Sequence, residues 1–87
     1  MRVIAIKNIA RKNVPIYYRM LYTGVAEMEL VNKTEEHVIE FSIEIKPTGD
    51  KEIVISYKSD IQYPLLPVTK ALKATIGAMH SDGELPD

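Results

Sequence analysis

Two stretches in which apolar and polar residues alternate predict a β-hairpin at residues 38–58. Every second residue of the first stretch is apolar, and the same pattern resumes after a short polar break. A period of two with many β-branched residues is typical of strands that bury one face. The residues expected on the buried face are Ile39, Phe41, Ile43, Ile45, Ile53, Ile55 and Tyr57.

The break between these stretches determines which residues face each other. We take Thr48-Gly49-Asp50 as a three-residue loop. A shift by one residue would turn one strand over, so the character of both faces supports the resulting register. The predicted pairs are Ile45 with Ile53, Ile43 with Ile55, Phe41 with Tyr57, Lys46 with Glu52, and Glu40 with Lys58.

A longer apolar run, residues 16–32, precedes the hairpin. Its even positions are all apolar apart from Gly24, which predicts one long strand bent near Thr23-Gly24, because an interior glycine marks a bend or bulge. The alternative is a helix over residues 15–23, capped by Asn13 and ended by Gly24. Three tyrosines and the unbroken alternation favour the strand.

The two ends of the chain supply one more strand and one helix. Residues 2–7 are apolar at consecutive positions, which predicts a short strand covered on both faces, and residues 8–13 are expected to connect it onward. Apolar residues at intervals of three or four predict a helix at roughly residues 64–80. Its stripe consists of Leu65, Val68, Leu72, Ile76 and Met79.

Together these elements predict an α+β fold, in which an antiparallel sheet of about four strands (a β-meander) packs against one C-terminal helix. We expect residues 1–80 to form a single domain, since 87 residues suffice for only one. Residues 81–87 contain Gly83 and Pro86 and are expected to be a flexible tail.

A single helix is too short to cover the long strand. About 16 helical residues span about 24 Å, whereas an extended strand of that length spans about 53 Å. The strand must therefore fold over at Gly24, or part of it overhangs and meets another chain. The opposite face of the sheet also carries apolar residues, which predicts a homo-oligomer, most simply a dimer. The candidate self-association residues are Tyr17, Leu21, Val25, Val38 and Val54.

Composition narrows the compartment and the chemistry. The chain has no cysteine, which excludes disulfides, thiolate metal sites and thiol nucleophiles. A domain this small in an oxidising compartment would benefit from a disulfide, so we expect a cytoplasmic protein. The apolar run Val3-Ile4-Ala5-Ile6 is too short for a signal peptide or a membrane span, so we expect no membrane association.

Charge is distributed unevenly along a chain of net charge −1. Residues 1–20 hold five bases and no acid, and residues 21–60 hold nine acids and four bases. The two parts either neutralise each other on folding or attract charged partners. Basic residues with nearby tyrosines suit nucleic acid, and the candidate contacts are Arg11, Lys12 and Arg19. The pI near 6.1 is far below the usual basic range, and no nucleic-acid-binding motif is present.

Candidate catalytic and metal-binding residues are few. His37 and His80 lack a metal-ligand spacing, so both are expected to be exposed. A positive charge on His80, near the helix C-terminus, is expected to be favourable. Four acids, Glu27, Glu29, Glu40 and Glu44, are expected on one open sheet face, where water or a cationic partner, including the basic N-terminal segment, would neutralise them. No cofactor is expected.

The sequence therefore predicts a non-enzymatic interaction or assembly module that associates with itself through its sheet. Another protein partner is compatible with the same surface. The alternative is a small nucleic-acid-binding accessory protein that uses the basic N-terminal segment. An enzyme built from the acidic face and His37 ranks last, because no catalytic motif accompanies these residues.

Overall fold

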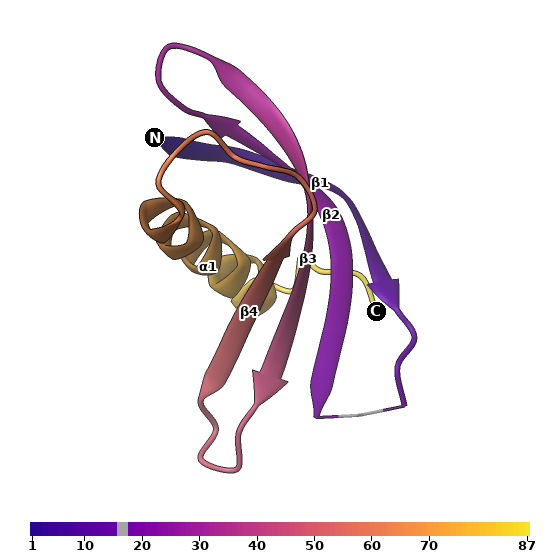
Figure 1. The fold of residues 1–87 in the computed structure, drawn as a ribbon. Coiled ribbons are helices and arrows are strands. Elements are labelled where there is room, and N and C mark those ends of the chain that lie inside the picture. Colours follow the sequence, from indigo (N-terminus) through magenta and orange to yellow (C-terminus); the bar gives the residue numbers. More distant parts are fainter. Residues whose placement is uncertain (16–17) are drawn as a thin grey trace.

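The computed structural model describes residues 1–15 and 18–87, and it confirms the predicted α+β fold (Figure 1). Within these residues, four antiparallel strands form one open sheet in the order β1-β2-β3-β4, followed by one helix. Each strand pairs with the next along the chain, so the sheet is the expected meander. The elements are β1 (Arg2–Lys12), β2 (Arg19–Glu29), β3 (Thr34–Ile45), β4 (Lys51–Tyr57) and α1 (Leu65–Ser81).

The hairpin formed by β3 and β4 exists, but its predicted register is wrong by two residues. Ile43 faces Ile53, Phe41 faces Ile55 and Ile39 faces Tyr57. The loop is Pro47-Thr48-Gly49, closed by hydrogen bonds between Lys46 and Asp50 and between Gly49 and Lys46. Proline suits the first position of this turn, and glycine accepts the positive φ of 92° at its end.

A shift of two residues keeps the apolar face of each strand intact. The alternation therefore predicts the two faces correctly, although it does not predict the pairs. Of the two predicted charge pairs, Lys46 and Glu52 still meet, at 3.1 Å between Nζ and Oε2, as diagonal neighbours. The predicted partners Glu40 and Lys58 are replaced as a pair, since Glu40 lies opposite Ser56.

Strand β1 is longer and less regular than predicted, because it continues through the residues expected to form a connection. Its pairing with β2 is interrupted twice, at Ile4 and around Asn8, which has a φ of 54°. Both interruptions are β-bulges, which let a strand continue after its alternation breaks. The expectation that both faces are covered is also wrong, because Ile4 is 39% exposed at the sheet edge.

Gly24 explains how the second bulge is accommodated. A Cβ at this position would lie 3.2 Å from Ile6 Cγ2 and 3.4 Å from Ile9 Cγ1. The missing side chain lets two isoleucines of β1 pack across β2, so the irregularity that the glycine signalled lies in the neighbouring strand.

The described part of residues 16–32 is a strand from Arg19 onward, so the helix alternative is wrong for residues 19–23. The predicted start of this strand at Ile16 and Tyr17 lies outside the described residues. Near this end, the inner-face residues Tyr18 and Ile45 are 52% and 37% exposed. The sheet therefore extends beyond what α1 covers, as the comparison of lengths indicated.

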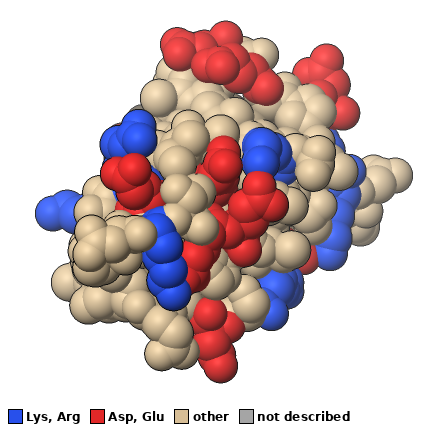
Figure 2. All heavy atoms as spheres, turned by 90° about the horizontal axis from the view of Figure 1, so that it is seen from above, with Lys and Arg blue, Asp and Glu red and all other residues tan. Residues whose placement is uncertain are grey.

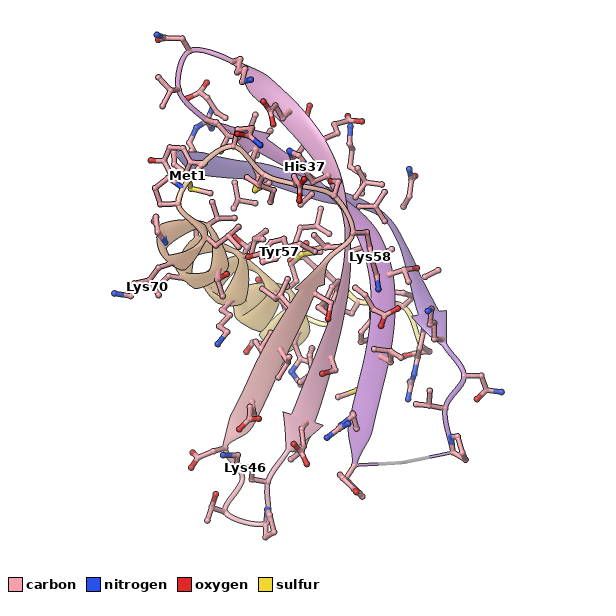
Figure 3. All side chains as sticks on the ribbon, in the orientation of Figure 1. Met1, His37, Lys46, Tyr57, Lys58 and Lys70 are labelled. Atoms are coloured by element: carbon pink, nitrogen blue, oxygen red, sulfur yellow. The ribbon has the colours of Figure 1, made fainter. Side chains whose placement is uncertain are left out.

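The core lies between the inner face of the sheet and α1. Val68, Leu72 and Ile76 of the predicted stripe are fully buried, and they meet a stacked pair formed by Tyr22 and Phe41. Figure 3 shows Tyr57 pointing from β4 toward the helix, where its hydroxyl bonds to Thr69 Oγ1. The helix thus closes the face that alternation predicted to be apolar.

The segment after α1 turns back toward the sheet. Gly83 has a φ of 71° and its amide bonds to the His80 carbonyl, which ends the helix. Leu85 is half-buried against the core, so this segment adds cover beyond the end of α1. Whether residues 81–87 are flexible, as predicted, stays a prediction.

Candidate interaction surface

The outer face of the sheet, opposite α1, carries four of the five candidate self-association residues. Val25 faces Val38 across β2 and β3, while Leu21 and Val54 flank Ser42. Val38 and Val54 are each 51% exposed, and the other two are half-buried. The structure thus brings these four together as an apolar strip on one face. Tyr17, the fifth candidate, lies outside the described residues.

Part of this strip lines a shallow hollow of about 290 Å³. Leu21 and Val54 form apolar parts of its wall, and Ser42 lies between them. Because the hollow is open and its lining mixes apolar with polar groups, it suits contact with another protein surface better than enclosure of a small molecule.

Ion pairs frame the apolar strip, and they join the two oppositely charged parts of the chain. Each of the four acids predicted to share this face meets a base from residues 1–20. Acidic groups on the face seen in Figure 2 are accordingly flanked by lysines and arginines. The pairs are Arg2–Glu29 at 3.6 Å, Lys7–Glu27 at 3.8 Å, Lys12–Glu40 at 2.6 Å and Arg19–Glu44 at 3.7 Å.

These contacts shift two ionisation equilibria in the expected direction. Its hydrogen bond from Lys12 lowers the pKa of Glu40 below the usual 4.5. A hydrogen bond to Glu36 raises the pKa of Lys7 above the usual 10.5. Both shifts favour the charged forms, so the face keeps its balanced pattern of charges at neutral pH. The basic N-terminal segment therefore acts as the cationic partner of the acidic face.

The candidate nucleic-acid residues do not form one basic patch. Successive residues of a strand point to opposite faces, so Arg11 lies on the inner side, opposite Tyr22, and Lys12 lies on the outer side, opposite Leu21. Lys12 and Arg19 are both on the outer face and are both ion-paired with glutamates. A phosphate group would have to compete with these carboxylates.

His37 is at the centre of a polar contact that sequence reasoning missed. Its Nδ1 lies 2.7 Å from Ser59 Oγ, and its Nε2 lies 2.7 Å from Glu35 Oε1. The side chain is only 10% exposed, so the expectation of an exposed histidine is wrong. Figure 3 shows His37 on the part of β3 near the chain that follows β4. The alternation of β3 places Glu35 and His37 on one face, but Ser59 required the correct register.

A histidine between a hydroxyl and a carboxylate is an arrangement that can activate a serine. Here the carboxylate is shared, because Lys33 Nζ lies 2.6 Å from Glu35 Oε2. The hydrogen bond from Lys33 is the main cause, and that from His37 the second, of the lowered pKa of Glu35. This weakens Glu35 as a proton acceptor. The contact ties the start of β3 to the segment that leads into α1.

His80 differs from its expectation in another way. It is partly buried at the end of α1, and its Nδ1 is buried without a hydrogen-bond partner in the described part of the chain. Burial, with a contribution from Lys51, lowers the pKa of His80 below 6.5. The predicted benefit of a positive charge at this helix end is therefore outweighed by desolvation.

Two surveys of the described residues bear on other kinds of site. Among residues 1–15 and 18–87, no group of three or more histidine or acidic side chains is placed to hold a metal ion. Over the same ranges, no helix has the length and apolar character needed to cross a membrane.

The fold and this surface define a class, that of small α+β proteins in which one helix covers one face of an open antiparallel sheet. The chain belongs to a protein family that is known by a serial designation rather than by an activity, and the model of this family matches residues 1–81. That range spans the whole sheet and α1. No curated protein and no solved structure matches the chain.

Proposed function

We propose that this protein is a non-enzymatic assembly module that associates with itself through its sheet. The observation that carries the proposal is the apolar strip of Leu21, Val25, Val38 and Val54, whose two outermost valines are each 51% exposed. Exposed apolar groups rimmed by charges are typical of surfaces that bind protein.

The ion pairs around the strip support a protein partner. Because bases and acids alternate on this face, it offers no field of one sign to a polyanion. A second copy presents the same mixture of charges and can match it by rotation. The contact centred on His37 supports a structural role, since it joins two segments of the chain.

Light scattering over a concentration series tests the proposal. We expect the mass to rise with concentration from 9.8 kDa, the mass of one chain, toward twice that value. A mass of one chain throughout the micromolar range would contradict it.

Nucleic-acid binding is the alternative proposal, and the same samples test it. Mixing with a short oligonucleotide at low salt is expected to leave the mass unchanged. Binding that weakens steeply with salt, and that is lost in the Arg11→Glu/Lys12→Glu variant, would instead favour the alternative.

A further inference from the structure

The two edges of the sheet differ in how well they are protected against pairing. An edge strand exposes unpaired backbone groups, and proteins commonly block such edges with bulges or charges. Strand β1 has both, since its two bulges accompany Arg2, Lys7, Arg11 and Lys12. Strand β4 pairs with β3 without a bulge from Lys51 to Tyr57, and it contains no proline.

Hydrogen bonds at both ends of β4 show which of its backbone groups face outward. The amide of Lys46 bonds to the carbonyl of Asp50, and the amide of Lys58 bonds to the carbonyl of Val38. In an antiparallel ladder, hydrogen-bonded pairs recur at every second residue. Even-numbered residues of β4 therefore bond to β3, and the backbone groups of Lys51, Ile53, Ile55 and Tyr57 point to the open edge. No described strand lies beyond them (Figure 1).

We infer that two copies of this chain pair antiparallel along β4, about a two-fold axis beside Val54, and so join their sheets into one. This inference rests on the proposed self-association and names the strand that carries it. In this register Ile53 of one copy faces Ile55 of the other, and Lys51 faces Tyr57. All four residues with outward backbone groups then form hydrogen-bonded pairs within the strand.

The side chains fit the same register. Ile53 and Ile55 are partly buried on the inner face, and their pairing extends the apolar core across the axis. On the outer face, Val54 meets Val54 of the second copy and becomes covered. Beyond the ends of the strand, Asp50 comes opposite Lys58, so the charges are complementary.

Neighbouring registers fit less well. Centring the axis on Ile53 places Glu52 opposite Val54 and Lys51 opposite Ile55, which sets charged groups against apolar ones. Centring it on Ile55 pairs Lys51 with Ser59, which lies beyond the end of β4. The register centred on Val54 is the one that uses the whole strand and leaves no charge opposite an apolar residue.

The absence of cysteine from the sequence provides a direct test by cross-linking. In the inferred dimer, Val54 and its copy form a non-hydrogen-bonded pair with Cα atoms about 4.5 Å apart, within the range of about 4.4–6.8 Å that a disulfide spans. Val54→Cys should therefore form a covalent dimer under mild oxidation. Val38→Cys is the matched control, because Val38 has the same residue type and the same 51% exposure on the same face.

We expect about tenfold more covalent dimer from Val54→Cys than from Val38→Cys on a non-reducing gel, since only the first pair lies within disulfide range. Equal or greater cross-linking of Val38→Cys would overturn edge pairing in favour of contact between outer faces. Cross-linking of neither variant, with a dimeric mass of the unmodified chain, would overturn edge pairing and leave self-association intact. Cross-linking of neither variant, with a monomeric mass, would overturn both.

Discussion

Individual residues of this protein show how the two oppositely charged parts of the chain meet. Glu40 illustrates this, because it lies on β3 and accepts a hydrogen bond at 2.6 Å from Lys12 of β1. The two residues are 28 positions apart in sequence and lie on strands separated by β2. Pairing between side chains this far apart ties the edge strand to the middle of the sheet.

The lowered pKa of Glu40 makes its contribution to stability depend on pH. The folded state holds this proton less tightly than the unfolded chain does. The pair therefore stabilises the fold above pH about 4.5, and that contribution is lost as the pH falls through the folded-state pKa.

Glu40→Gln is accordingly expected to lower the urea midpoint at about pH 7, and to match the unmodified chain at about pH 3, where Glu40 is protonated. Glu84→Gln, at an exposed position after α1, is the control and should change neither midpoint. An equal loss for Glu40→Gln at both pH values would show that the ion pair is not its cause.

At the scale of elements, two glycines that look alike in sequence have opposite roles. Gly49 ends the hairpin loop with a φ of 92°, a conformation that other residues adopt only with strain. Gly77 lies inside α1, where a Cβ would meet only Ile53 Cδ1, at an ordinary distance of 3.7 Å.

The same substitution at these glycines should therefore change the free energy of unfolding in opposite directions. Gly49→Ala is expected to destabilise by about 1–2 kcal/mol, the usual cost of a left-handed conformation with a Cβ. Gly77→Ala should stabilise by up to about 1 kcal/mol, because alanine favours helix. Thermal or urea unfolding of the two variants measures both effects. Destabilisation by Gly77→Ala would mean that α1 packs more closely on β4 than described.

The elements with regular patterns were predictable, and their exact pairing was not. Alternation and the helical stripe identified β2, β3, β4 and α1, because side-chain direction depends only on local period. The register of β3 and β4 escaped prediction because a shift by two preserves both faces. Strand β1 was cut short because its bulges interrupt the alternation at Ile4 and Asn8.

The candidate surface follows the same division. Position parity placed Leu21, Val25, Val38 and Val54 on one face, as the structure shows. The contact between His37 and Ser59 joins residues 22 apart in sequence, and it depends on the register that alternation leaves open. Local pattern therefore finds a face, and cross-strand geometry finds the partners on it.

At the scale of the whole molecule, one helix covers one face of a four-stranded sheet and leaves the other face and one regular edge open. The ion pairs balance the charge of the open face, and bulges protect the β1 edge. What is left is an apolar strip that ends at β4, the strand without such protection. Self-association through the sheet would cover both features at once.

Amide hydrogen exchange at two protein concentrations tests this central claim most directly. In the associated state, the amides of Ile53, Ile55 and Tyr57 bond across the dimer, so we expect their exchange to slow markedly at the higher concentration. The amides of Val54 and Ser56 bond to β3 in either state and should serve as internal controls that exchange slowly throughout. Exchange rates that are identical at both concentrations along the whole sheet would contradict the account.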